Sequence, residues 1–241
     1  MTFELSPEQQ AVRDRARGFA EARLASVAAA IDDSASIPAD VLRELQAMVA
    51  ASAADATTLV VSVEQLAIAS PAAAAAIALD QSARPAAADA AGLRGFRATD
   101  AADPRGRLVF AAIAAGIGRA AIREALRVLR AAGRGGEEPE KPHWVVADAA
   151  TEVEAARMLT LQAAQAVAAG GDASGAVAMA KLAATRAAQQ AVDAALRVAG
   201  PDGFARGTLV ERLTRDVRAV SLLMGTEEEL RAAVAQAVLQ G

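Results

Sequence analysis

The chain has 241 residues, of which 54% are hydrophobic, so it can bury a sizeable core in one large or two small domains. Aromatic residues make up 2% and the apolar residues are mainly Ala, Leu and Val, a composition that favours closely packed helices and predicts an all-α fold. The absence of cysteine excludes disulfides and thiolate chemistry. A net charge of −4 argues against a nucleic-acid partner.

The start of the chain and its longest apolar run argue against targeting and membrane segments. MTFELSPEQQ lacks the basic and apolar regions of a signal peptide, and the apolar run from Leu108 to Gly118 is far shorter than the roughly 18 residues of a spanning helix. We therefore expect a cytoplasmic protein with no membrane partner. The single histidine, His143, and the lack of carboxylates clustered at ligand spacing predict no metal site.

Residues 1–83 predict an N-terminal helical domain. Ser6-Pro7 followed by Gln9 is typical of a helix start with a capping box, and the helix is expected to extend to about Ile31. Three further helices are expected, beginning near Ser36-Ile37-Pro38, spanning about 57–68, and spanning 71–82.

The next stretch, residues 84–107, contains no alternating apolar run that indicates a strand, and we interpret it as a linker. Residues 108–241 predict a second helical unit, with helices over about 108–132 and 144–169, a break at 170–172 and another long helix after it. Thr226 and Glu229 form a second capping-box pattern, T-x-x-E, which predicts the start of a last helix.

Two features of the helix over 108–132 allow more than one interpretation. Arginines recur at helical spacing at positions 119, 123, 127 and 130, which indicates either a solvated face or a surface for an anionic ligand or acidic partner. Gly116 and Gly118 lie within the helix with no preceding strand, so they make a poor dinucleotide-binding loop.

The stretch RVAGPDGFARGTLVERLTRDVRAVSLLMGTEEEL, residues 197–230, resembles the C-terminal active-site segment of the acyl-CoA dehydrogenases. In that family a GGxGY-like turn, a VERLxRDxR helix and an EGT loop follow one another at this spacing. The resemblance covers nearly the whole chain except the linker and is most specific from Ala147 to Thr226. It implies an N-terminal helical bundle and a C-terminal up-down four-helix-type bundle, with the linker in place of the family's middle β-domain.

Neither base position of the family carries a carboxylate in this sequence. The resemblance places a glutamate in the EGT loop, where this chain has Met224, and an alternative base at the start of the helix after the β-domain, where it has Gly106. We therefore expect no catalytic residue at either position. Glu227, Glu228 and Glu229 lie just beyond the loop, where they are expected to favour the helix start.

The family binds FAD across a subunit boundary, and this implies four cofactor-binding positions, Arg197, Gly200, Gly203 and Thr226. The turn at 132–136, which supplies an arginine to the cofactor in the family, matches at Gly136 alone. Pro201 replaces a backbone N–H that a phosphate could have used. The turn after Arg197 is therefore interpreted either as a remnant of a flavin site or as a helix end and connection.

These residues lead to one hypothesis and two alternatives. The hypothesis is a degenerate acyl-CoA dehydrogenase-like subunit that is non-catalytic alone and forms a homo-oligomer, or a hetero-oligomer with a full-length acyl-CoA dehydrogenase. Its cofactor is either FAD at a subunit interface or none. One alternative is an active FAD-dependent dehydrogenase with a relocated base. The other is a purely structural helical oligomer without a cofactor.

Overall fold

The computed structural model of the chain describes residues 4–82, 104–133 and 141–240. Every regular element in these ranges is a helix, which confirms the all-α prediction. The expected linker lies outside the described residues from 84 to 103. Its last part, residues 104–107, is helical, because the helix expected from Leu108 begins at Pro104.

The N-terminal helices follow the predicted order. The first is α1 (Pro7–Phe19), which continues through a π-helical turn, η1 (Ala20–Leu24), into α2 (Ala25–Ser34). Both hydrogen bonds of the predicted capping box are present between Ser6 and Gln9. The remaining helices of this unit are α3 (Ala39–Ser52), α4 (Ala56–Ala69) and α5 (Pro71–Ser82).

The C-terminal unit consists of three long helices and two shorter ones. The long helices are α6 (Pro104–Ala131), α7 (Lys141–Ala168) and α8 (Ser174–Ala199). A 3-10 turn, η3 (Gly200–Phe204), leads to α9 (Leu209–Leu222) and then to α10 (Glu227–Gln240).

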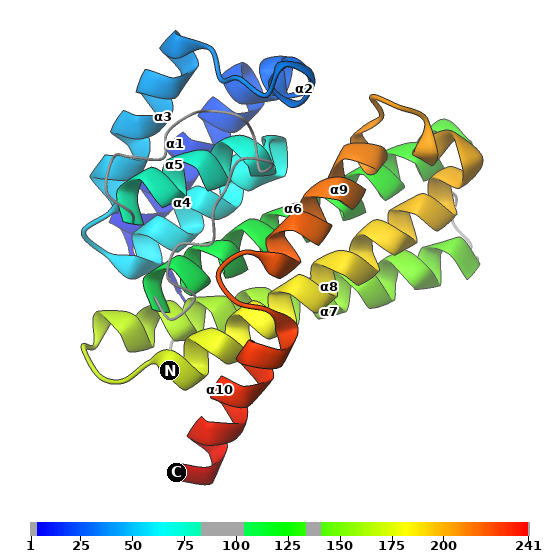
Figure 1. Ribbon diagram of the computed structural model, residues 1–241. Coiled ribbons are helices and arrows are strands. Elements are labelled where there is room, and N and C mark those ends of the chain that lie inside the picture. Colours follow the sequence, from blue (N-terminus) through cyan, green and yellow to red (C-terminus); the bar gives the residue numbers. More distant parts are fainter. Residues whose placement is uncertain (1–3, 83–103, 134–140, 241) are drawn as a thin grey trace.

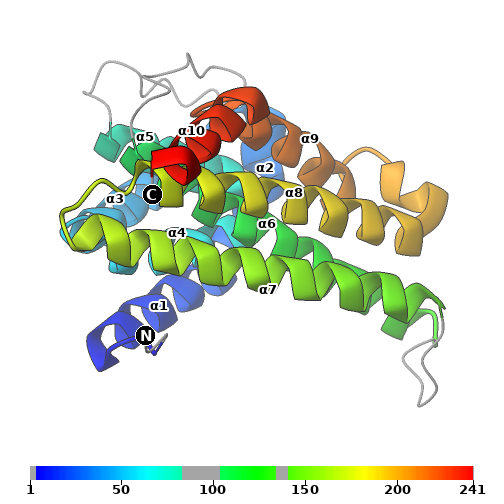
Figure 2. The same cartoon turned by 90° about the horizontal axis from the view of Figure 1, so that it is seen from below.

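Helix α6 lies at the centre of the molecule. Figure 1 shows α1 to α5 gathered at one end of the long helices, while α9 lies along them and α10 projects beyond them. The view in Figure 2 shows α7 and α8 side by side along one face. Residues 108–118 of α6 are all buried, because α4, α5, α7, α8 and α9 all pack against this helix. The core is continuous between the N-terminal and C-terminal helices.

The two glycines in α6 allow close helix packing. A Cβ added at Gly116 would lie 2.6 Å from the Cβ of Ala67 and 2.7 Å from the backbone oxygen of Glu64, both on α4. A Cβ added at Gly118 would lie 2.6 Å from a methyl group of Val153 on α7. These glycines therefore bring α6 close to its neighbours, and the structure gives them no role in a dinucleotide loop.

A buried carboxylate links the two helical units. Glu64 on α4 is 1% exposed and accepts hydrogen bonds from Arg119 on α6 and from Arg157 on α7, with Arg157 Nε 3.0 Å from both carboxylate oxygens. Arg119 thus meets an acidic residue of the same chain. Arg123 and Arg130, also in the predicted arginine stripe, are exposed.

Candidate functional site

The loop between α9 and α10 contains the first of the two base positions. Met224 has a φ of 60°, and Gly225 after it has a φ of 109°, so the backbone is left-handed at both residues. This conformation costs a non-glycine residue roughly 1–3 kcal/mol. The Met224 side chain is 3% exposed and belongs to the hydrophobic core. The position is therefore filled by a packed apolar side chain.

Two cations bind the carbonyl groups of this loop. Arg107 Nε donates a hydrogen bond to the Met224 oxygen at 3.3 Å, and Lys181 Nζ donates one to the Gly225 oxygen at 2.8 Å. Lys181 is fully buried. Burial, followed by the positive charge of Arg107, lowers the pKa of Lys181 to about 8. The loop is thus fixed through its backbone, with positive charge beneath it.

The two base positions lie close to each other. Gly106 is buried in the first turn of α6, and its neighbour Arg107 contacts the loop that carries Met224. The structure therefore brings together the two segments that the resemblance selects. Neither position has an ionisable side chain, so neither supplies the proton acceptor that a general base requires.

The glutamates after the loop are engaged elsewhere. The Thr226 N–H donates to Glu229 Oε2 at 2.7 Å, and the Glu229 N–H donates to Thr226 Oγ1 at 3.4 Å, which confirms the second capping box. Glu227 forms ion pairs with Arg186 on α8 and Arg231 on α10. Thr226 therefore serves as a helix cap in this structure.

The glycine turn after α8 is built as a connection between helices. Gly200 has a φ of 65°, a conformation that glycine adopts without strain, and it ends α8. Gly203 is buried, and a Cβ there would lie 2.9 Å from the Cβ of Ala199. The Gly203 oxygen accepts a hydrogen bond from Thr208 Oγ1 at 3.0 Å. Close packing and helix termination account for both glycines.

The four predicted cofactor positions do not converge within the single chain. Arg197, Gly200 and Gly203 lie at the C-terminal end of α8, whereas Thr226 follows Gly225, which contacts Lys181 near the other end of that helix. At a rise of 1.5 Å per residue, the positions 181 and 197 are about 24 Å apart along the axis. The four positions therefore form two groups, one towards each end of α8.

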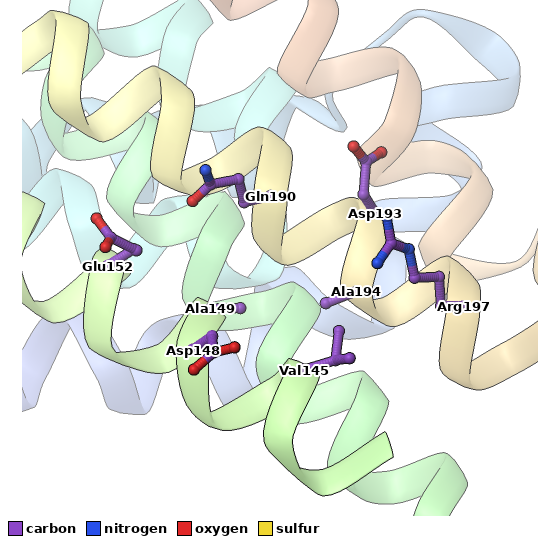
Figure 3. A pocket seen from close by; sticks show the side chains of 8 residues that line it. All are labelled: Val145, Asp148, Ala149, Glu152, Gln190, Asp193, Ala194 and Arg197. Atoms are coloured by element: carbon purple, nitrogen blue, oxygen red, sulfur yellow. The ribbon is translucent and has the colours of Figure 1, made fainter. Parts of the chain in front are cut away.

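Arg197 lies beside a pocket that the sequence analysis did not identify. The pocket has a volume of about 340 Å³ and is formed by α7 and α8 (Figure 3). Its lining residues are Val145, Asp148, Ala149, Glu152, Gln190, Asp193, Ala194 and Arg197. The polar members are four residues apart on α7 and three and four residues apart on α8, and this spacing could have placed them on one face of each helix. That they share a pocket depends on how the two helices pack.

A second group of charges lies between α2 and α9. Arg215 donates hydrogen bonds of 2.8 and 2.6 Å to the two carboxylate oxygens of Asp32, and it also forms an ion pair with Glu211 one helical turn earlier. The adjacent Asp216 has no hydrogen bond or ion pair within the described part of the chain. Burial, followed by the negative charge of Asp32, raises the pKa of Asp216 to about 7, against the opposing charges of Arg215 and Arg212.

Two expected absences concern the described ranges. No group of histidine, cysteine, aspartate and glutamate side chains there is arranged to hold a metal ion. No helix there combines the length and hydropathy that crossing a bilayer requires.

The fold is that of a helical bundle in which the first turn of the long central helix α6 contacts the loop between α9 and α10. The model of the acyl-CoA dehydrogenase C-terminal domain matches residues 93–239. The chain therefore belongs to the acyl-CoA dehydrogenase family, as its sequence suggested, in a short all-helical form.

Individual relatives agree with this assignment. A 3-sulfinopropanoyl-CoA desulfinase from Advenella mimigardefordensis is 34% identical over 149 residues, which cover 61% of this chain and 37% of that protein. Butyryl-CoA dehydrogenase from Megasphaera elsdenii has a TM-score of 0.80 and 18% identity, with coverage of 99% of this chain and 100% of that one. A structure of PigA with FAD and proline has a TM-score of 0.76, 12% identity and full coverage of both chains. The chain spans little more than a third of the curated relative's length.

The residues of the single chain do not fit a flavin pyrophosphate. Arg197 shares its pocket with the carboxylates of Asp148, Glu152 and Asp193, which repel a phosphate. Pro201 supplies no N–H to the turn. The lining of this pocket therefore does not provide a site for a flavin pyrophosphate within the single chain.

Proposed function

We propose that the chain is a degenerate acyl-CoA dehydrogenase-like subunit that does not catalyse dehydrogenation on its own. The observation that carries this proposal is the buried thioether of Met224, at the position where the sequence resemblance places the family's catalytic glutamate. Abstraction of an α-proton requires a base within hydrogen-bond reach of the substrate, and methionine cannot accept that proton.

The active-dehydrogenase alternative requires a relocated base, and the nearby carboxylates are poorly suited to that role. Glu229 accepts the backbone N–H of Thr226, and Glu227 is held by two arginines. The cations Arg107 and Lys181 hold the carbonyl groups of the loop, so a carboxylate near them would be held ionised and its basicity would be low.

The named relatives support the family assignment and leave the reaction open. The desulfinase from Advenella mimigardefordensis is named for a reaction other than dehydrogenation, so this fold carries more than one chemistry. Its aligned part covers 37% of that protein, and its activity is therefore not transferred to this chain. We propose a supporting role within an assembly, either with a second copy or with a full-length acyl-CoA dehydrogenase.

The visible spectrum and a dye-reduction assay test this proposal. We expect the purified chain to be colourless, to take up no added FAD, and to reduce no flavin-coupled dye with acyl-CoA substrates. Yellow protein that reduces the dye would establish the relocated-base alternative and overturn the proposal.

Co-expression with a full-length acyl-CoA dehydrogenase tests the form of the assembly. A stable complex supports the hetero-oligomer, and a self-associated chain supports the homo-oligomer. A strict monomer that also forms no complex would contradict the proposed role in an assembly. The variant Met224→Glu is a useful comparison, because restoring the carboxylate without the remaining flavin housing should not restore dye reduction.

A further inference from the structure

A second pocket lies where the start of the chain meets the end of a long helix. It has a volume of about 240 Å³ and is formed by residues at the start of α1, at the start of α4 and in the last two turns of α7. Figure 2 shows the N-terminal end of α1 on the side of the molecule where α7 ends. The pocket shares no residue with the loop at Met224 or with the predicted cofactor positions, so it is a separate site.

Negative charge dominates this pocket. Among the described residues, its lining includes the carboxylates of Glu4 and Asp55 and no arginine, lysine or histidine. Burial raises the pKa of Asp55, but hydrogen bonds from Thr58 and Gln9 outweigh this effect and hold the pKa below its ordinary value. The last turn of α7, which contains Gln165, has no basic residue, so its carbonyl end adds partial negative charge. The pocket therefore favours a cation.

Three polar groups in the pocket have hydrogen-bonding capacity left for a ligand. Thr57 is 5% exposed, and its hydroxyl makes no hydrogen bond within the described part of the chain. A buried polar group without a partner costs stability, so this hydroxyl points to a bound molecule. Asp55 accepts hydrogen bonds from the Thr58 N–H and hydroxyl and from Gln9 Nε2, all at Oδ2, which leaves capacity at Oδ1. The Gln165 side chain makes no hydrogen bond in the described ranges.

The rest of the lining selects the type of cation. Leu5 and Leu161 supply apolar walls that suit a short hydrocarbon chain. None of the described lining residues is aromatic, whereas quaternary ammonium ions are recognised by aromatic rings. A calcium or magnesium ion requires about six oxygen ligands, and no side-chain group in the described ranges is arranged to hold a metal ion. A primary ammonium group has three N–H donors, which match the acceptors of Asp55, Thr57 and Gln165.

We propose that this pocket binds a small primary ammonium ion with a short alkyl chain. Asp55, Thr57 and Gln165 hold the ammonium group. The alkyl chain lies against Leu5 and Leu161. The volume of about 240 Å³ is below the range of about 300–1,000 Å³ that is typical of sites for drug-sized ligands, so the ligand is small. This inference goes beyond the proposed function and does not rest on it.

Titration with butylammonium chloride at pH 7, followed by ¹H–¹⁵N NMR, tests the site. Butylammonium should cause saturable shifts at the amides of residues 55–58 and 161–168. Tetramethylammonium chloride has the same charge and should bind at least about tenfold more weakly, because it has no N–H donor. From ethylammonium to pentylammonium, each added methylene should tighten binding by up to about fourfold, since it is buried against the two leucines. Equal binding of both ammonium types, or no dependence on chain length, would overturn the proposal.

Two variants of the lining and one matched control locate the binding. Asp55→Asn removes the charge and keeps the helix cap, so it should weaken butylammonium binding at least about tenfold without unfolding α4. Thr57→Val removes the hydroxyl with little change in volume and should weaken binding about two- to tenfold. Asp202→Asn, at an exposed position beyond the C-terminal end of α8, should leave the dissociation constant within about twofold. Equal effects of Asp55→Asn and Asp202→Asn would overturn the site. None of these results depends on dye reduction, so this site and the lack of catalysis fail separately.

Discussion

Replacing Gly116 with alanine should force α6 away from α4. The new Cβ would lie 2.6 Å from the Cβ of Ala67 and 2.7 Å from the backbone oxygen of Glu64. Carbon atoms in normal contact are about 3.5–4.0 Å apart, so a separation on the order of 1 Å is needed. Neither neighbouring atom can move by rotating a side chain, because one is a Cβ and the other is backbone. The helices themselves must shift.

The expected loss of stability follows from two opposing effects. Overpacking a close contact costs about 1–3 kcal/mol, while alanine in place of glycine within a helix returns up to about 1 kcal/mol. We therefore expect Gly116→Ala to reduce the free energy of unfolding by about 1–2 kcal/mol. At about 2–4 °C per kcal/mol for a chain of this size, the Tm falls by roughly 2–8 °C. The shift also moves Glu64, which holds Arg157, and this adds to the loss.

Urea unfolding followed by circular dichroism measures this effect, and Gly18→Ala is the matched control. Gly18 is exposed within α1, and a Cβ added there meets nothing within 4 Å. The control should gain about 0.5–1 kcal/mol from helix propensity alone. If Gly116→Ala is as stable as Gly18→Ala, the two helices are not in close contact and the packing argument is wrong.

Two further predictions concern pH. The pKa of Asp216 is raised to about 7, so its stabilising contribution is complete below the unfolded pKa near 4 and is lost as pH rises through 7. As the pH rises from 5 to 8, the free energy of unfolding of Asp216→Asn should therefore rise relative to that of the wild type, by at most about 4 kcal/mol. Urea unfolding at each pH measures this difference. A variant less stable than the wild type at pH 8 would show that the charge is needed. The pKa of Lys181 is lowered to about 8 in the folded protein. The contribution of this side chain to the stability of the fold is therefore present above the unfolded pKa near 10.5 and is lost as pH falls through 8. As the pH rises from 7.5 to 10, the free energy of unfolding of the wild type should rise by about 2–3 kcal/mol relative to that of Lys181→Met. Parallel pH profiles of the two proteins would contradict the buried charge.

The parts of this fold that the sequence predicted are those with local signals. The capping boxes at Ser6 and Thr226 are confirmed because each is complete within four residues of chain. The sequence predicts a start near Leu108 for the helix that begins at Pro104. The expected start is too late because the first turn of the helix has charged residues and a glycine and lacks an apolar periodicity. Local pattern therefore predicted the helices better than their ends.

The arrangement of the site depended on contacts between distant residues. The sequence located Met224 and Gly106, but the contact between the two segments is made by Arg107, 117 residues before Met224, and no local pattern encodes it. The pocket beside Arg197 likewise combines residues of two helices. The assignments of Arg197, Gly200 and the other cofactor positions stay predictions, since a ligand-binding measurement is required to test them.

The loop at Met224 is held by contacts of its backbone oxygens. Its contacts with Arg107 and Lys181 use the backbone oxygens of residues 224 and 225, and Thr226 caps α10 with its own hydroxyl and N–H. None of these contacts involves the side chain at 224. These contacts therefore place no requirement on the side chain at 224, and the methionine there adds apolar packing to the core. Under the proposed function, the shape of the loop depends on backbone atoms and a proton acceptor would depend on the side chain, so the two requirements fall on different atoms of the same residue.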